Sequence, residues 1–145
     1  MVENIKGIYI MEYINVLNSL YARLQYGITA EIFYKNTGER IVRQLDIDDL
    51  QFCKGVIIRP YLRPLSKMTR NEKSRLGKRY LFSITGNSIN IRHHSEGLWD
   101  TETDARLEDY IWLIDWLNRH HFDYQGMIDN FMALEAPDDM YLNKN

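Results

Sequence analysis

The four histidines stand in two adjacent pairs, His93-His94 and His120-His121, and imidazole is well suited to metal binding and to proton transfer near neutral pH. Metal sites use imidazoles that share a face, four residues apart on a helix or two apart on a strand. Adjacent histidines diverge on either element, so at most one of each pair can serve a site. One histidine from each pair could join Asp123 in a composite site; the alternative is one packed and one solvated imidazole in each pair. We expect no metal and no cofactor.

Nucleophilic catalysis has little support in the sequence. Cys53 is the only cysteine, so no internal disulfide can form, and a reducing compartment is expected. It lacks a local nucleophile signature, and no serine elbow, Walker loop or dinucleotide fingerprint is present. Asp46-Ile-Asp-Asp49 lacks the glycine and the closing glutamate of an EF-hand loop and predicts a solvated turn. We expect a protein that is not an enzyme.

A strongly basic segment covers residues 59–79 and contains a single acid, Glu72. Tyr61 and Tyr80 bracket it, and bases could stack on these rings beside guanidinium groups. The segment could therefore bind an anionic ligand, either nucleic acid or a nucleotide signal of host defence. The alternatives are a plain solvated face and pairing with the acidic residues of 96–115. Its cations are Arg59, Arg63, Lys67, Arg70, Lys73, Arg75, Lys78 and Arg79.

The densest apolar run lies in residues 110–128, and its spacing from Leu107 onward predicts a helix with two apolar faces. One face is a stripe of Leu107, Tyr110, Ile111, Ile114 and Leu117, which we expect the protein's own core to bury. Trp112 and Trp116 are four residues apart and lie nearly opposite that stripe. We expect this tryptophan face, with Trp99 and Tyr124, to bind a partner protein. The alternative is a second layer of core that covers both indoles.

These residues must be positioned by a mixture of hairpins and helices. Alternating residues around Gly38 and around Gly86-Asn87 predict two β-hairpins, at 28–45 and 80–92. Helical spacing predicts a helix over about 12–25 that Gly27 ends, and the capping box Thr69-Arg-Asn-Glu72 predicts a helix from Arg70 to about Leu76 that stops at Gly77. The prolines at 60 and 64 predict an extended path after a strand at 56–58.

Another capping box, Thr101-Glu-Thr-Asp104, should begin the helix that frays near His120, and a turn with a shorter helix should follow in 122–132. The fold class is therefore α+β: a small antiparallel sheet of two hairpins packed by three or four helices. Hydrophobic residues make up 45% of the chain and charged residues 26%, which is typical of a soluble globular protein. We expect a single domain over 1–145 with a loose tail from about 138, no membrane span and a cytoplasmic location.

Three further segments are distinctive: Pro60-Tyr-Leu-Arg-Pro-Leu-Ser-Lys-Met-Thr69, the box Asp115–Ile128, and Ala133-Leu-Glu-Ala-Pro137. Together they resemble a group of small proteins encoded by phages and prophages of Bacteroides-type gut bacteria. The resemblance covers the C-terminal half and, loosely, the hairpin at 28–45. It implies an accessory protein of a mobile element, without implying a chemistry. Where that group reads Asp-Tyr-Arg-Gly-Leu-Ile, this chain has Gln125 and Met127, so no role of that arginine carries over.

The sequence thus predicts a phage or prophage accessory protein of the host cytoplasm, a candidate for counter-defence, that acts by binding. A protein partner from host or phage is the first hypothesis, with self-association as a further expectation. Capture of nucleic acid or a nucleotide by the basic segment is the alternative. The net charge of −2 excludes a surface that is basic throughout, but it is compatible with a local basic patch.

Overall fold

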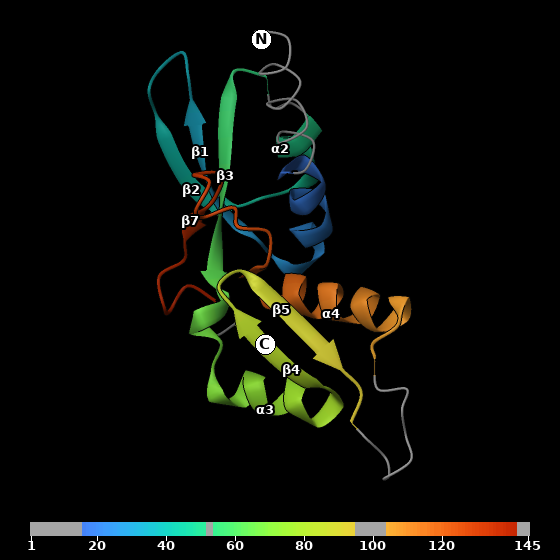
Figure 1. Ribbon diagram of the computed structural model, residues 1–145. Coiled ribbons are helices and arrows are strands. Elements are labelled where there is room, and N and C mark those ends of the chain that lie inside the picture. Colours follow the sequence, from blue (N-terminus) through green and yellow to red (C-terminus); the bar gives the residue numbers. More distant parts are fainter. Residues whose placement is uncertain (1–15, 52–53, 95–103, 142–145) are drawn as a thin grey trace, which may run out of the picture. The chain divides into compact units, whose positions relative to one another are not determined.

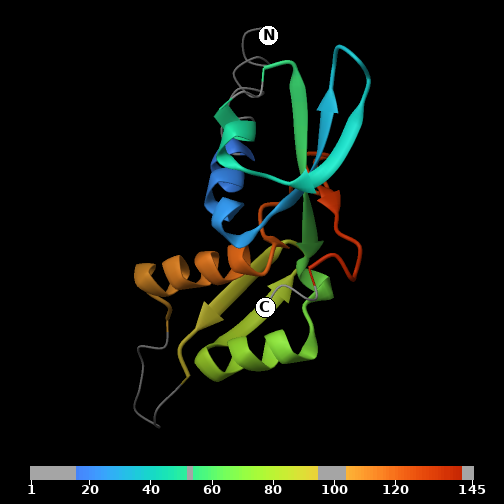
Figure 2. The same cartoon turned by 180° about the vertical axis from the view of Figure 1, so that it is seen from behind.

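A computed structural model describes residues 16–51, 54–94 and 104–141 of the chain. The chain, drawn in Figures 1 and 2, divides into two compact units. Unit 1 comprises Met1–Leu62 and Met127–Asn145, and unit 2 comprises Arg63–Gly126. The secondary structure is α+β, with two antiparallel hairpins and four α-helices in the described ranges, as the sequence predicts. The expectation of a single domain stays a prediction.

Unit 1 is built on the first predicted hairpin. Strands β1 (Thr29–Tyr34) and β2 (Arg40–Gln44) are antiparallel, and β3 (Val56–Pro64) lies antiparallel on the other side of β1. The short strand β7 (Leu134–Glu135) then pairs in parallel with β3. Residues 16–23 are helical, and the 3₁₀ turn η1 (Leu24–Tyr26) that follows them ends at Gly27, whose φ of 72° is the left-handed value expected of a helix C-terminus. The hairpin at 28–45 and the glycine stop are confirmed.

The acidic turn predicted at 46–49 is instead the start of a short helix, α2 (Ile47–Gln51). Two aspartates cap it reciprocally, because the Asp46 carboxylate accepts from the Asp49 N–H at 3.2 Å and the Asp49 carboxylate accepts from the Asp46 N–H at 2.8 Å. This is the capping-box logic with aspartate at both positions. The three-residue spacing of Asp46 and Asp49 fits a helix cap as well as a solvated turn, and the prediction of a turn did not include the cap.

The core of unit 1 lies under one face of its sheet. Nine buried residues form it: Leu20, Ile28, Ala30, Ile32, Leu45, Leu50, Leu62, Met127 and Ala133. Tyr141 packs against this cluster, and its hydroxyl donates to the Tyr61 carbonyl at 2.7 Å. Burial raises the pKa of the Tyr141 hydroxyl to about 12. The predicted loose tail from 138 is therefore wrong as far as Tyr141, which is anchored; 142–145 lie outside the described ranges.

Unit 2 begins with the last residues of β3 and the 3₁₀ turn η2 (Leu65–Lys67), which lead into helix α3 (Arg70–Arg79). The predicted capping box is present: the Thr69 hydroxyl accepts from the Glu72 N–H, and the Glu72 carboxylate accepts from the Thr69 N–H. The helix does not stop at Gly77. It continues to Arg79, because the Tyr80 N–H still donates to the Leu76 carbonyl at 2.9 Å.

The second predicted hairpin, β4 (Leu81–Thr85) with β5 (Ser88–Arg92), is confirmed, and Gly86 at its turn has a φ of 59°. Helix α4 (Leu107–Arg119) follows and ends near His120 as predicted. Its start is later than predicted, and of the expected box only Asp104 lies in the described ranges; it forms a β-bridge with Arg92. Figure 1 shows the hairpin between α3 and α4.

The shorter helix predicted within 122–132 is absent from that described range. The segment holds strand β6 (Phe122–Asp123), which pairs in parallel with the end of β3, and then turns. Two residues have left-handed backbone without being glycine: His121 at φ 63°, just before this segment, and Phe131 at φ 61°, within it. That conformation ends a helical repeat, and side-chain spacing alone does not reveal it.

We expect Phe131→Gly to raise the free energy of unfolding by about 0.5–1 kcal/mol, because glycine adopts positive φ freely while phenylalanine is strained there. The ring is 81% exposed, so its loss removes little packing. The measurement is urea denaturation of both proteins. His121→Gly is the matched contrast. His121 has nearly the same φ as Phe131, but its side chain is only 5% exposed. Removing that side chain should leave a cavity and make the variant less stable than the wild type. A destabilised Phe131→Gly protein would show that the exposed ring supports the fold.

Candidate functional site

The tryptophan face of α4 is turned into the core of unit 2. Trp116 is 6% exposed and lies among the buried residues Leu65, Met68, Leu76, Tyr80, Ile91, Leu113, Leu117 and Phe122. Trp112 is half-buried and packs against the same cluster, with its ring 6.3 Å from that of Trp116. The prediction that this face is the free one is wrong, and the alternative of a covering core layer holds for Trp116. Trp99 lies outside the described ranges.

The opposite face of α4 is the exposed one. The side chains there recur at three- and four-residue steps, which places them in one stripe along two turns. We call them the α4 stripe: Leu107, Tyr110, Ile111 and Ile114, which are 77%, 37%, 61% and 43% exposed. The expectation that the domain buries this stripe is wrong except for Leu117, which is 1% exposed. Both periodicities were readable in the sequence; which of them faced the core was not.

Tyr124, the other predicted contact residue, is half-buried and its hydroxyl donates to the Asn118 side chain at 2.9 Å. It belongs to the partly buried rim of the unit 2 core. Its polar end is thus engaged inside the unit, and it does not extend the α4 stripe.

Arg79 joins the two predicted sites, because its guanidinium lies 4.2 Å from the centre of the Trp112 ring. Its Nε also donates to the Tyr80 hydroxyl at 3.3 Å, and that hydroxyl donates to the Asp109 carboxylate at 2.8 Å. A guanidinium stacked on an indole is held in place by a cation–π contact. The last cation of the basic segment therefore covers part of the tryptophan face from within the same unit.

The Asp109 carboxylate contacts three groups: the Tyr80 hydroxyl, the His93 ring and the Arg106 N–H. Its carboxylate accepts from the Arg106 N–H at 2.8 Å, which caps α4, and it lies 2.7 Å from Nε2 of His93. The backbone hydrogen bond, followed by those from Tyr80 and His93, outweighs desolvation and lowers the pKa of Asp109. A histidine paired with a carboxylate is a common acid–base unit. Here the carboxylate also caps a helix and holds a buried tyrosine, so it has a structural role.

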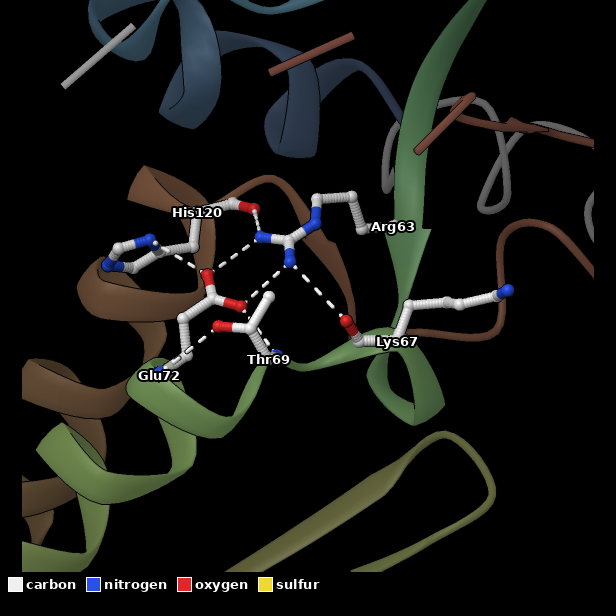
Figure 3. A network of polar contacts seen from close by, with 5 residues as sticks. All are labelled: Arg63, Lys67, Thr69, Glu72 and His120. Carbon is white, nitrogen blue, oxygen red and sulfur yellow. Dashed lines mark hydrogen bonds and ion pairs between the residues drawn. The ribbon is translucent and has the colours of Figure 1, made fainter. Parts of the chain in front are cut away.

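A second polar network surrounds Arg63 (Figure 3). The guanidinium donates to both carboxylate oxygens of Glu72, at 2.8 and 2.7 Å, and to the backbone carbonyls of Lys67 and His120. The His120 Nδ1 lies 3.3 Å from the same carboxylate, and the guanidinium lies 4.3 Å from the centre of the Phe122 ring. The side chains of Arg63 and Glu72 are only 18% and 11% exposed.

Burial would raise the pKa of Glu72, but hydrogen bonds from Arg63, His120 and the Thr69 backbone outweigh it and hold that pKa well below the usual carboxyl range. Arg63 is thus committed to an internal ion pair and cannot be counted with the ligand-binding cations. Glu72, the one acid of the basic segment, is turned inward with it.

The rest of the basic segment is distributed over both units. Arg59 and Tyr61 are half-buried residues of β3 in unit 1, while Tyr80 is 2% exposed and has no face available for stacking a base. Lys67 ends η2. The exposed cations that the structure brings together are those of α3: Arg70, Lys73, Arg75, Lys78 and Arg79.

Metal binding gains no support from the described ranges. No group of three histidine, cysteine, aspartate or glutamate side chains gathers there. His94 bonds the Gly77 carbonyl at 2.8 Å, His121 is buried, and the Asp123 carboxylate accepts from the Gln125 N–H. The composite site that the sequence leaves open, as the alternative to packed and solvated imidazoles, thus gains no support from these residues.

Unit 1 has a cavity of about 340 Å³ between its sheet and α2. Two of the three acidic residues that line it are already engaged: Asp46 and Asp49 cap the helix, and the Arg43 guanidinium donates to Asp49 at 2.7 Å. The hydrogen bond from Arg43 lowers the pKa of Asp49 in spite of desolvation. The lining residues are Ile32, Tyr34, Arg43, Asp46, Asp48, Asp49, Val56 and Ile58.

The segments that carry the phage-protein resemblance bind one another through the backbone. Within unit 2, Arg63 pairs with Phe122, and its N–H donates to the His121 carbonyl at 2.8 Å. Within unit 1, Tyr61 pairs with Leu134, and the Ala136 N–H donates to the Leu62 carbonyl. These distinctive segments thus have a structural role in joining the strands of each unit.

Among the described residues, no helix is long and apolar enough to cross a bilayer. A comparison of the chain with family models, with curated proteins and with solved structures finds no match in any of the three.

Proposed function

We propose that this protein is a protein-binding module that docks the α4 stripe into an apolar groove of a partner. Leu107, Tyr110, Ile111 and Ile114 occupy positions i, i+3, i+4 and i+7, which are the anchor positions of a helix that lies in a hydrophobic groove. This single observation carries the proposal, because a contiguous exposed apolar stripe on a folded helix is uncommon and marks interaction surfaces.

The α4 stripe is presented on a rigid support, which favours binding. The opposite side of the helix is fixed by Leu113, Trp116 and Leu117, all buried in the unit 2 core. Asp109 caps the first turn through the Arg106 N–H. A preformed helix loses little conformational entropy on docking. The resemblance to phage and prophage proteins supports a host or phage protein as the partner, in the host cytoplasm, where counter-defence is one role for such contacts.

The test is capture from phage-infected host lysate followed by affinity measurement with the captured polypeptide. We expect Ile111→Ser with Ile114→Ser to weaken binding by roughly 30-fold or more, since two central anchors of a groove are lost. The fold should persist, because both side chains are exposed.

The matched control is Val42→Ser with Ile47→Ser, which removes two exposed aliphatic side chains from unit 1, each 53% exposed. The control should retain the partner. If both double variants retain it equally, the α4 stripe is not the docking surface. If the purified protein self-associates and only the α4 variant is monomeric, the partner is a second copy, and the proposal of a foreign partner fails.

A further inference from the structure

We propose that the solvent face of α3 binds the phosphate backbone of double-stranded nucleic acid without reading its sequence. Leu76 and Glu72 are buried and define the inward side of this helix. By helical geometry, the cations are spread over the remaining arc, with Arg70 and Lys78 facing outward and Lys73 and Arg75 on its two flanks. Asn71 and Ser74, which can donate hydrogen bonds to phosphate, share the arc.

These cations have no internal purpose that the structure reveals. Among the described residues, the side chains of Arg70, Lys73, Arg75 and Lys78 form no ion pair, hydrogen bond or ring contact. They also face one another at three-residue steps, and each like-charge pair of this kind costs a helix about 0.2–0.5 kcal/mol. A uniformly cationic face that costs stability favours an external anion.

The arrangement of the cations decides which anion fits. They diverge from a convex helix and are spread over about 12 Å of its length, at 1.5 Å per residue. One nucleotide would need them to converge in a pocket, whereas a polymer offers a phosphate to each cation. The nucleotide signal considered from the sequence is therefore the poorer fit.

Two kinds of side chain are absent from the exposed face of α3, and their absence limits which anionic ligands fit it. Single-stranded nucleic acid is usually held by exposed aromatic rings on which bases stack, and Tyr80, the ring nearest α3 in the sequence, is buried. A bilayer surface would call for apolar side chains beside the cations. The exposed arc of α3 carries neither kind, so phosphates of a duplex are the ligand that its chemistry matches.

The test is fluorescence anisotropy of a labelled duplex of arbitrary sequence, titrated with the full chain over a series of salt concentrations. The plot of log affinity against log salt should have a slope of about −3 to −4, since four cations each release about 0.9 counterions. Lys73→Gln with Lys78→Gln should make that slope shallower by about 2 and weaken duplex binding at every sequence. Glutamine keeps the helix, because its propensity is close to that of lysine.

Lys35→Gln with Lys54→Gln removes the same charge from exposed lysines of unit 1 and should leave the slope unchanged. An equal effect of both pairs, or no duplex binding at low salt, would overturn the proposal. So would tighter binding of a single strand of the same length, of ATP, or of vesicles containing anionic lipid. The variant with Ile111→Ser and Ile114→Ser should bind the duplex as tightly as the wild type does. A failure of the protein-docking proposal can therefore be distinguished from a failure of the duplex-binding proposal.

Discussion

Replacing Trp116 with alanine should lower the free energy of unfolding by about 3–5 kcal/mol, as expected for a large aromatic side chain removed from a packed core. The indole is 6% exposed, and its ring centre lies 4.5 Å from that of His120 and 6.1 Å from that of Phe122. The surrounding rings cannot collapse fully into the space that it leaves. Urea denaturation followed by circular dichroism measures the loss, since the change also removes much of the tryptophan fluorescence.

Ile111→Ala is the matched control, because it truncates an apolar side chain on the same helix at a position that is 61% exposed. Its free energy of unfolding should stay within about 0.5 kcal/mol of the wild-type value. The pair of variants distinguishes the inner face of α4 from the outer one. If Ile111→Ala destabilised the protein as much as Trp116→Ala, the stripe would be part of a core, and the docking proposal would lose its basis.

The elements that the sequence predicted well are those defined by local chemistry. The hairpin at Gly86-Asn87, the glycine stop at Gly27 and the capping box at Thr69 each depend on residues within a few positions of one another. Predicting from neighbouring residues alone also explains the errors at helix ends. Gly77 could have ended α3, but the hydrogen bond from Tyr80 to Leu76 closes another turn, and Tyr80 is buried in the core.

The face of α4 that enters the core could not be predicted, because both faces have helical periodicity. An indole offers more apolar area than the side chain of isoleucine, so burying Trp116 gains more free energy than burying Ile111 would. Leu113 and Leu117 extend the tryptophan face, and both are buried. Their positions beside the indoles were visible in the sequence, but helical periodicity by itself does not rank the two faces of the helix.

Contacts between distant segments were beyond sequence reasoning. Arg63 was counted as one of many surface cations, yet it lies against Phe122 and ion-pairs with Glu72. Nothing in the spacing of residues 63, 72 and 122 indicates that they meet. The basic segment therefore separated into an internal arginine and the external cations of α3, and only the structure could make that division.

Glu72→Gln should cost about 3 kcal/mol of unfolding free energy at neutral pH, because it leaves the Arg63 guanidinium without its counter-charge in a largely buried site. Glutamine can still serve as the N3 residue of the capping box at Thr69, so the change isolates the charge. Two further variants serve as comparisons for this loss of stability. Glu31→Gln, at the ion pair in which Arg40 is 58% exposed, should cost less than about 1 kcal/mol. Arg63→Met with Glu72→Met should recover much of the loss.

The dependence of this loss on pH tests its electrostatic origin. The pKa of Glu72 is lower in the folded protein than its ordinary value of 4.5, so the unfolded chain binds the proton more readily. The stabilisation is therefore complete above that ordinary value and is lost as the pH falls toward the folded pKa. The stability gap between wild type and Glu72→Gln should be constant above about pH 5 and narrow below it. A gap that stays constant in acid would show that the shape of the side chain, and not its charge, holds Arg63.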